Sequence, residues 1–394
     1  MTKKDLSIYI HIPFCVKKCL YCDFLSAAPR ENELKQYKEA LINEIRRAAV
    51  YAHDYTVKTV FIGGGTPSIY EGQDMCDIVN ELKSSFENIR GGSYAPFEVT
   101  IECNPGTVDY EKLVKFRECG INRISFGLQS ADNDELKKLG RIHCYEDCVE
   151  SVNAAKKAGF DNINIDLISG LVGQSVASFE KTLRKVMEQD VKHISVYSLI
   201  VEEGTPFYEM YNPDNLSDDE YEAWEEIDRQ IYDMTYELLL KNGYERYEIS
   251  NYAKPGYECK HNIVYWERGD YLGLGIGAAS LINEERFKNS SDIETYIRHF
   301  ERDNGQTFLH EEHEKLSKED ILAEHIMLGL RKCNGISVEE VSDLCEIDFL
   351  TTYKDVIDKW VEAGCLEMKS GRLYCTEKGM SVNNSVIVDF VSIE

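Results

Sequence analysis

The stretch from His11 to Phe24, HIPFCVKKCLYCDF, decides the fold, and its centre is a group of three closely spaced cysteines. Three residues separate Cys15 from Cys19, and two separate Cys19 from Cys22. Soft thiolates at this spacing wrap one iron–sulfur cluster or one metal ion. A structural zinc site is closed by four ligands, so three cysteines leave one coordination position open. The motif therefore predicts a cluster that also binds a small chelating ligand.

Strand-like and helix-like patterns alternate over the first two-thirds of the chain. Apolar runs typical of strands lie at residues 7–12, 58–65, 97–105, 121–130, 161–170 and 193–200. Helix-like segments separate them, and a long helix over 218–242 closes the region. Short apolar strands that alternate with helices indicate an α/β fold with a parallel sheet, either an open barrel or a doubly wound sheet.

Glycine and polar residues stand where these predicted strands end. They are Gly63–Thr66, Glu102, Gln129 and Asp166. Parallel α/β folds place their functional sites at the carboxyl ends of the strands. We therefore expect these residues to share one face of the sheet.

The last third of the chain has a different pattern. Residues 244–271 are irregular and aromatic, and from residue 316 helix patterns lie at 321–331, 338–345 and 350–363, before a β pair that turns at Ser370–Gly371. Helices followed by a two-stranded wing predict a small C-terminal winged-helix-like α+β domain. The domain boundaries that we predict are 1–242, 243–315 and 316–394. The acidic run 337–348 argues against a DNA-reading role for the last domain.

Composition limits the possible partners and compartment. The 394-residue chain has a formal net charge of −26, which argues against nucleic acid or an anionic membrane surface as the main partner. No apolar run approaches transmembrane length, and the N-terminus shows no signal-peptide pattern, so we expect a cytoplasmic protein without a transmembrane segment. The thirteen cysteines should then be reduced, and the ten outside the opening motif are interpreted as small buried hydrophobic residues.

The motifs taken together resemble the radical S-adenosylmethionine (SAM) superfamily. Within it they resemble the group that contains oxygen-independent coproporphyrinogen dehydrogenases and heme chaperones. After YIHIPFC and the two further cysteines come, in the family's order, GGGTPS at 63–68, ECNP at 102–105, SFGLQS at 125–130, GRIH at 140–143 and DLISGLVGQ at 166–174. One departure is Val172, where the family usually has proline. The resemblance implies a partial (β/α)6 barrel of the radical SAM type, with the small C-terminal domain added.

The resemblance also implies the cofactors and their ligands. A 4Fe–4S cluster would bind Cys15, Cys19 and Cys22, and its fourth iron would chelate the amino and carboxylate groups of SAM. Gly64, Gly65 and Thr66 would let the backbone approach the methionyl part of SAM, because glycine has no side chain to block it. Glu102 would accept the ribose hydroxyls, and Arg141 would pair with the SAM carboxylate. The other family positions that contact SAM are matched by Tyr9, Tyr21, Gln129 and Asp166.

Three features separate the two branches of this group. Phe24 stands where the dehydrogenase has a fourth cysteine, and only fourteen residues precede Cys15, which leaves no room for the dehydrogenase's N-terminal extension. HNIVYW at 261–266 resembles the HNxxYW motif of heme chaperones. A neutral imidazole suits heme iron, and aromatic rings stack on the macrocycle. The heme residues implied are His261, Asn262, Tyr265 and Trp266, with Tyr252 and Cys259 as alternative iron ligands.

The function that we expect is a heme chaperone, which binds heme and transfers it to apo-hemoproteins, including those of membrane respiratory complexes. Porphyrinogen dehydrogenase activity should be absent, and whether SAM is cleaved is left open. One alternative is a radical SAM enzyme that oxidises or decarboxylates porphyrin-like substrates. A second alternative is a zinc-stabilised binding module with His11 as the fourth ligand.

Overall fold

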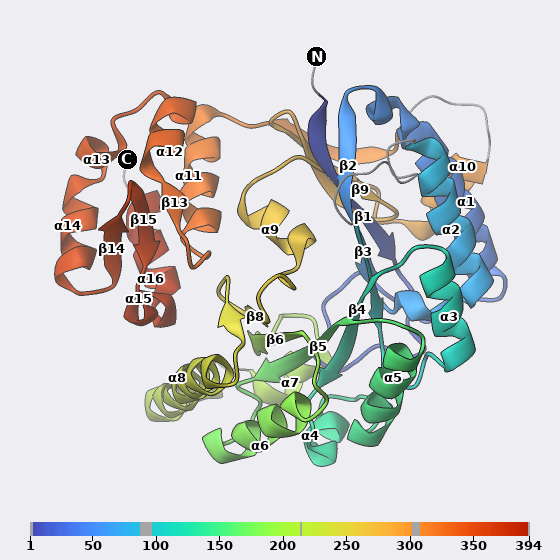
Figure 1. Ribbon diagram of the computed structural model, residues 1–394, viewed down its shortest axis with the longest axis horizontal. Coiled ribbons are helices and arrows are strands. Elements are labelled where there is room, and N and C mark those ends of the chain that lie inside the picture. Colours follow the sequence, from blue (N-terminus) through green and yellow to red (C-terminus); the bar gives the residue numbers. More distant parts are fainter. Residues whose placement is uncertain (1–2, 87–96, 213–214, 302–307, 393–394) are drawn as a thin grey trace.

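The computed structural model describes residues 3–86, 97–212, 215–301 and 308–392, and its centre is a curved sheet. Six strands run parallel in chain order: β1 (Lys4–Ile12), β2 (Tyr55–Gly64), β3 (Glu98–Cys103), β4 (Arg123–Gln129), β5 (Asn162–Ser169) and β6 (His193–Ser198). The helices between them are α1 (Glu33–Ala48), α2 (Gly72–Ser85), α3 (Tyr110–Glu118), α4 (Asn133–Lys138), α5 (Tyr145–Lys157) and α6 (Val176–Met187). These helices lie along one side of the sheet (Figure 1). A doubly wound sheet carries helices on both sides, so the structure confirms the predicted partial (β/α)6 barrel.

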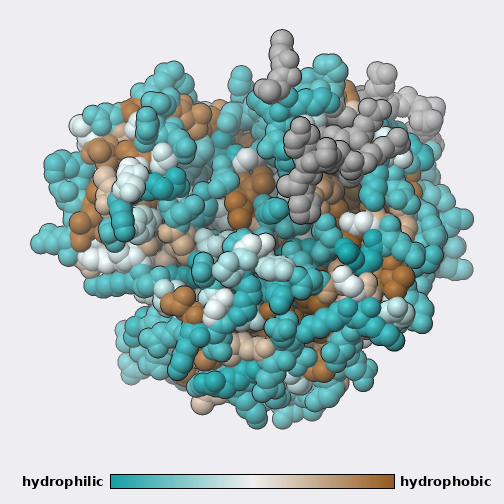
Figure 2. All heavy atoms as spheres, viewed as in Figure 1, coloured by the Kyte–Doolittle hydropathy of each residue, from teal (hydrophilic) through white to brown (hydrophobic). Residues whose placement is uncertain are grey.

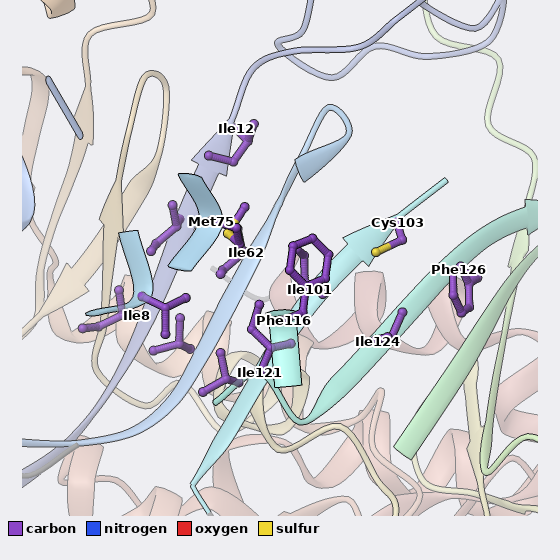
Figure 3. Packing of buried hydrophobic residues seen from close by; sticks show 14 of the residues in the cluster. Ile8, Ile12, Ile62, Met75, Ile101, Cys103, Phe116, Ile121, Ile124 and Phe126 are labelled. Atoms are coloured by element: carbon purple, nitrogen blue, oxygen red, sulfur yellow. The ribbon is translucent and has the colours of Figure 1, made fainter. Parts of the chain in front are cut away.

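Apolar side chains are gathered between this sheet and its helices. The face shown in Figure 2 is mostly hydrophilic, with hydrophobic residues in small separate groups. Inside, Ile8, Ile62 and Ile101 of neighbouring strands pack under Met75 of α2 and Phe116 of α3 (Figure 3). All five side chains are buried, and burial of apolar area is the main force that holds the sheet to its helices.

The strands alternate apolar and polar residues, which gives the opposite face of the sheet a polar character. In β1, Ile8 and Ile10 are part of the core under the helices, while Tyr9 and His11 point to the other side, since side chains alternate along a strand. Lateral pairing then sets polar residues side by side. Glu102 of β3, for example, pairs with Ser125 of β4.

Short strands extend the sheet beyond the predicted six. Next to β1 lies the parallel strand β9 (Tyr271–Leu274), followed by the antiparallel strands β10 (Ala279–Ile282), β11 (Glu285–Asn289) and β12 (His310–Lys315). The other edge carries β8 (Asn251–Ala253) and β7 (Glu245–Arg246). Residues 243–315 therefore complete the same twelve-stranded sheet at both edges. Sequence patterns missed these strands because they are short and because β12, HEEHEK, is polar and largely exposed.

The remaining helices of this region are α7 (Pro206–Tyr211), α8 (Asp218–Lys241), α9 (Lys260–Trp266) and α10 (Ile293–Glu301). Two 3-10 turns lie at Ala49–His53 and Pro67–Ile69. The predicted long helix corresponds to α8. The helix α9 lies on the open side of the sheet, opposite α1–α6 (Figure 1). Its first backbone N–H groups, those of Lys260 and His261, donate to the carboxylate of Glu98 on β3 at 3.2 and 3.1 Å.

The C-terminal domain has a hydrophobic core of its own, which includes Phe349, Leu373 and Phe390. Its elements are α11 (Lys318–Gly329), β13 (Ile336–Ser337), α12 (Val338–Cys345), α13 (Phe349–Thr352), α14 (Lys354–Glu362), β14 (Leu366–Lys369), β15 (Arg372–Cys375), α15 (Glu377–Ser381) and α16 (Asn383–Val391). The wing turns at Ser370–Gly371 as predicted, and both residues have positive φ, as a two-residue hairpin requires. In the described parts of the chain, no helix is both long and apolar enough to cross a membrane.

Candidate functional site

A cavity of about 420 Å³ opens where the parallel strands end, and we call it the outer cavity. It brings together the cysteines and the residues predicted for SAM, with Tyr9 as the exception. These lining residues are Cys15, Cys19, Tyr21, Cys22, Gly64, Gly65, Thr66, Glu102, Gln129, Arg141 and Asp166. Residues from four strands, β2 to β5, and from three loops thus converge on one space, as expected for the carboxyl edge of a parallel sheet.

The cysteine loop is fixed to the body of the protein by backbone and imidazole contacts. The N–H of Cys15 donates to the carbonyl of Ala27 at 3.0 Å. His11 Nε2 lies 2.8 Å from the carbonyl oxygen of Leu25, and His11 Nδ1 lies 3.0 Å from the hydroxyl of Tyr9. Because both ring nitrogens of His11 are engaged, this residue is no free fourth ligand, and the zinc alternative loses the ligand on which it depended.

Two of the cysteine sulfurs accept hydrogen bonds from residues of the outer cavity. The hydroxyl of Thr66 donates to Cys15 Sγ at 3.4 Å, and Arg141 Nη1 donates to Cys19 Sγ at 3.3 Å. Both hydrogen bonds hold the cysteine loop against the residues that line the outer cavity. Within the described residues, no group of three or more His, Cys, Asp or Glu side chains is placed to hold one metal ion.

The glycines after β2 let the chain pass closely under the cysteine loop. Gly64 has φ +111°, and a Cβ atom there would lie 2.6 Å from the His11 ring. A Cβ atom on Gly65 would lie 2.6 Å from the carbonyl oxygen of Phe14 and 3.0 Å from Cys15 Sγ. These glycines are therefore needed for the seating of the cysteine loop itself, in addition to any approach of a ligand.

Arg141 lines the outer cavity and is held there by polar neighbours. Its Nη2 donates to Asn104 Oδ1 at 2.9 Å and to the carbonyl of Gly127, and Asn104 Nδ2 in turn donates to Thr66 Oγ1 at 2.9 Å. Arg141 Nε is buried and finds no partner among the described residues. A guanidinium with an unused N–H suits a carboxylate ligand. Sequence reasoning missed Asn104, although it stands inside the quoted ECNP motif.

Two carboxyl groups face each other across the strand ends. Glu102 Oε2 accepts the N–H of Gly64 at 3.1 Å, and burial, together with nearby Asp166, raises the pKa of Glu102 to about 8. Asp166 accepts hydrogen bonds from the hydroxyl of Ser125 at 2.7 Å and from Asn164 Nδ2 at 2.8 Å. Sequence reasoning missed Ser125 and Asn164. Asn164 could have been found from the sequence. It stands two residues before Asp166 in the same strand, and side chains two residues apart lie on the same face.

Gln129 reaches the outer cavity through a distorted strand end. The register between β4 and β5 shifts between Gly127 and Gln129, and Gln129 has φ +74°. A bulge of this kind turns a side chain away from the regular alternation. The positive φ therefore occurs at Gln129, which the SFGLQS motif had already marked as a candidate site residue.

A second cavity of about 400 Å³ lies on the same polar face, and we call it the inner cavity. It shares Glu102, Ser125, Asp166 and Tyr197 with the outer cavity. Its other lining residues include Tyr9, Arg123, His261, Asn262 and Tyr265. Arg123, which sequence reasoning missed, is buried, and its Nε has no hydrogen-bond partner in the described parts of the chain. The inner cavity therefore connects the predicted SAM residues to α9.

The structure divides the HNIVYW motif between two places. His261 is buried, with Nδ1 2.8 Å from Thr59 Oγ1 and Nε2 3.0 Å from the hydroxyl of Tyr265. Burial and the charge of Arg123 lower the pKa of His261 to about 3, so the ring is neutral. Asn262 and Tyr265 line the inner cavity with His261, whereas Trp266 lines a separate cleft beside the C-terminal domain. The alternative iron ligands Tyr252 and Cys259 are also buried.

Comparisons with known proteins match this architecture. The family model of the radical SAM superfamily matches residues 9–186, and that of the HemN C-terminal domain matches residues 316–382. A protein of Lactococcus lactis named "Heme chaperone HemW" is 33% identical over 99% of this chain and 98% of the relative. Proteins of the same name are 32% identical in Bacillus subtilis, over 98% and 99% of the two chains, and 41% identical in Escherichia coli, over 69% of each.

A solved structure also matches along the whole chain. Coproporphyrinogen III oxidase (HemN) from Escherichia coli superposes with a TM-score of 0.82 and 22% identity, over 99% of this chain and 91% of that chain. At this identity the match shows the shared fold alone, which agrees with the barrel and the added C-terminal domain described above. Because the identity to the curated relatives extends over nearly the full length of both chains, the chain belongs to the HemW family within the radical SAM superfamily.

Proposed function

We propose that this protein is a heme chaperone, which binds heme and transfers it to apo-hemoproteins. The observation that carries the proposal is the 33% identity to a relative named "Heme chaperone HemW" over 99% of this chain and 98% of that relative. Two features of the chain support it. Phe24 lines the outer cavity where the dehydrogenase branch has a cysteine, and the HNIVYW motif forms α9 beside the inner cavity.

The proposal includes a 4Fe–4S cluster held by Cys15, Cys19 and Cys22. All three cysteines line the outer cavity, and the sulfurs of Cys15 and Cys19 accept hydrogen bonds from Thr66 and Arg141. A cluster with three protein ligands leaves one iron open, and that iron chelates the amino and carboxylate groups of SAM when it is bound. Thr66 and Arg141 therefore act as positioning residues for the cluster loop.

The residues that we propose for SAM are those assembled in the outer cavity, with Tyr9 reaching them from the inner one. The guanidinium of Arg141 would pair with the SAM carboxylate, and Glu102 would accept the ribose hydroxyls; both residues line the outer cavity. Gly64, Gly65 and Thr66 form the wall beside the cluster loop. Tyr9, Tyr21, Gln129 and Asp166 complete the proposed set.

For heme we propose that α9 is the recognition element. His261 and Tyr265 hold the helix through hydrogen bonds to each other and to Thr59, and Asn262 lies beside them on the inner cavity. Trp266 is free to contact the macrocycle on the opposite side of the helix. The motif would then both anchor α9 and offer one aromatic ring to the ligand.

The remaining expectations stand as part of the same proposal. We place the radical SAM core at 1–242, the extension with the heme motif at 243–315 and the winged-helix-like domain at 316–394. All thirteen cysteines are free, which fits a reducing cytoplasm. We propose that the recipients of the heme are apo-hemoproteins, including those of membrane respiratory complexes. The net charge of −26 argues against nucleic acid as a partner.

The test combines heme binding with a product assay on anaerobically purified, cluster-loaded protein. Hemin is titrated while the Soret band is followed, and a parallel sample receives reductant, SAM and coproporphyrinogen III, with products separated by chromatography. We expect one heme per chain and no decarboxylated porphyrinogen. Decarboxylated product formed over many turnovers would instead establish the enzyme alternative and overturn the chaperone proposal.

A further inference from the structure

Arg123 of β4 lines the inner cavity, and neither the cluster site nor the proposed SAM and heme sites use it. Only 2% of the residue is exposed, yet its side chain makes no hydrogen bond and no ion pair with any described residue. The other buried arginines of the described chain are paired. Arg246 lies 2.6 Å from Glu377, and Arg268 lies 2.7 Å from Glu324. A buried guanidinium has lost its hydration, so its unused N–H groups predict a polar partner inside the cavity.

The anions near Arg123 are engaged by other groups. Glu98 and Asp166 are close enough to interact with its charge. Glu98, however, accepts the first N–H groups of α9, at 3.2 and 3.1 Å. Asp166 accepts hydrogen bonds from Ser125 and Asn164, at 2.7 and 2.8 Å. The guanidinium therefore keeps its donors for a ligand in the inner cavity.

The wall of the inner cavity carries charges of both signs. Arg123 contributes a guanidinium and Asp166 a carboxylate. Burial and nearby Asp166 raise the pKa of Glu102, the other carboxyl group in the lining, to about 8, so Glu102 is protonated at neutral pH. Asp166 would repel a simple anion in this space, and Arg123 would repel a simple cation. A zwitterion meets both charges and brings no net charge into the buried space, so the wall favours a zwitterionic ligand.

The register of β4 and β5 determines how far apart the two charged residues stand. Arg123 pairs with Asn162, and Gly127 pairs with Asp166. Arg123 and Asp166 are therefore four residues apart along the strand direction. This offset corresponds to about 13 Å between the levels of their Cα atoms, and the long arginine side chain spans part of it. The acid and ammonium groups of a ligand must then be separated by several bonds, as they are in an ω-amino acid.

We propose that the inner cavity binds a small zwitterion of the ω-amino acid class, with its carboxylate on Arg123 and its ammonium group on Asp166. A carboxylate accepts two parallel N–H groups of a guanidinium, which satisfies the open donors of Arg123. Phe61 and Ala279, the apolar residues in the lining, contact the methylene chain. The inference goes beyond the proposed function and does not depend on heme binding.

Isothermal titration calorimetry of full-length, cluster-loaded protein tests which charges the ligand needs. SAM is left out, because Glu102 and Asp166 line both cavities. The probes are γ-aminobutyrate, butyrate, butylammonium and free glycine, whose two charges are adjacent. We expect γ-aminobutyrate to bind at least about tenfold more tightly than each of the others, because each of them lacks one charge or the spacing. No binding of γ-aminobutyrate, or equal affinity for any other probe, would overturn the proposal.

Two variants test which residue binds which end of the ligand. Arg123→Gln should bind γ-aminobutyrate at least about tenfold more weakly than wild type and butylammonium more tightly, because the repelling cation is gone. Asp166→Asn should also bind γ-aminobutyrate more weakly, but should bind butyrate more tightly. A damaged fold would not produce such a gain for one probe, so these opposite gains test the proposal even if a variant loses stability.

The matched control is Arg298→Gln, which removes an exposed arginine of α10 that pairs with Glu294. It should bind all four probes as wild type does, and circular dichroism checks that each variant is folded. If Arg123→Gln kept the wild-type affinity for γ-aminobutyrate, or if Arg298→Gln lost as much of it, Arg123 would not be the carboxylate site.

Discussion

At the scale of single residues, the opening cysteines differ from the other cysteines in their surroundings. Thr66 and Arg141 donate hydrogen bonds to the sulfurs of Cys15 and Cys19. Elsewhere eight of the ten cysteines are buried, whereas Cys144 and Cys333 are half-buried, which departs from the expectation that all ten lie in the core. Burial raises the pKa of Cys148, for example, to about 12, and a thiol in such an environment is a poor metal ligand.

Replacement of one opening cysteine should therefore remove the cluster. We expect Cys19→Ala to lose most of its iron and its visible absorption after anaerobic reconstitution, because a single missing ligand exposes the cluster to loss. Cys148→Ala, a core cysteine, should keep wild-type iron content at some cost in stability. Iron and sulfide analysis of both variants tests whether Cys19 is a cluster ligand. Equal iron in Cys19→Ala and wild type would contradict the assignment.

The raised pKa of Glu102 predicts a pH-dependent stability of the protein without SAM. Its folded-state pKa is about 8 and its unfolded value is near 4.5, so the folded state retains a proton that the unfolded chain loses. Stability from this group is present at low pH and is lost as pH rises from about 5 to about 8. Glutamine does not titrate, so Glu102→Gln should not lose stability from this position as the pH rises. The variant should gain stability relative to wild type over that range, with a slope of at most about 1.4 kcal/mol per pH unit.

Urea unfolding at several pH values measures this difference. Glu312→Gln, an exposed carboxyl on β12, serves as the matched control and should show a nearly constant difference from wild type. A Glu102→Gln difference that does not change with pH would show that Glu102 is ionised in the folded protein.

Residue-level prediction from sequence succeeded where a motif gave the position. The outer cavity gathers the cysteines and the motif residues because they stand at strand ends. Arg123 lay outside this reasoning, since a single arginine at the start of a strand gives no sign that it will be buried. Trp266 was assigned with its motif neighbours, but helix geometry turns it to the opposite side of α9 from the inner cavity.

At the scale of elements, α9 is held by contacts from distant strands more than by its own length. It has seven residues, which is too short for a stable isolated helix. Glu98 of β3 accepts its first N–H groups, and His261 is anchored to Thr59 of β2. Local sequence gave no helix signal in this aromatic stretch, because the stabilising partners lie more than 150 residues away.

Removal of the carboxylate that caps α9 should lower the free energy of unfolding. Glu98→Ala leaves two N–H groups at the start of the helix without an acceptor and removes one of the two carboxylates near buried Arg123, the other being Asp166. We expect a loss of about 2–4 kcal/mol in the free energy of unfolding. The exposed residue Glu312 provides the control Glu312→Ala, which should change stability by less than about 0.5 kcal/mol. If Glu98→Ala and Glu312→Ala were equally stable, the hydrogen bonds from α9 to Glu98 would make no net contribution to the free energy of unfolding.

The turn after β2 should tolerate no side chain at Gly65. A Cβ atom would lie 2.6 Å from the carbonyl oxygen of Phe14 and 3.0 Å from Cys15 Sγ, so Gly65→Ala should displace the cysteine loop and lower the iron content. Gly159→Ala meets no atom within 4 Å and has positive φ, so it should cost some stability but keep the iron. Thermal unfolding and iron analysis separate the two effects. Full iron content in Gly65→Ala would contradict this account of the loop.

The element pattern also shows the limits of sequence-based prediction. The six parallel strands were found because each has an apolar face under the helices. The strands β7 to β12 were missed because they have two to six residues, and β12 has no buried residue in its pattern. Their pairing comes from the edges of a sheet that is already formed, which no local pattern encodes.

At the scale of the whole molecule, the chain combines a barrel with a cluster site and a separate domain that closes a cleft over α9. Residues of the proposed SAM site and of the heme motif line the same inner cavity, Glu102 and His261 among them. The C-terminal domain is fixed to the barrel by ion pairs such as Arg246–Glu377 at 2.6 Å and Arg268–Glu324 at 2.7 Å. Tyr232 of α8 and Ile249 add apolar contact, because both pack against the hydrophobic core of that domain.

The most direct test of the central claim measures how heme leaves the protein. Heme-loaded protein is mixed with increasing concentrations of an apo b-type cytochrome, and transfer is followed by the acceptor's absorption; release to excess apomyoglobin, which captures free heme, is measured in parallel. A chaperone hands heme over in a complex, so the transfer rate should rise with acceptor concentration, saturate, and exceed the rate of release to apomyoglobin. A rate that is independent of the acceptor and equal to the release rate would mean passive dissociation, and would contradict the proposed function.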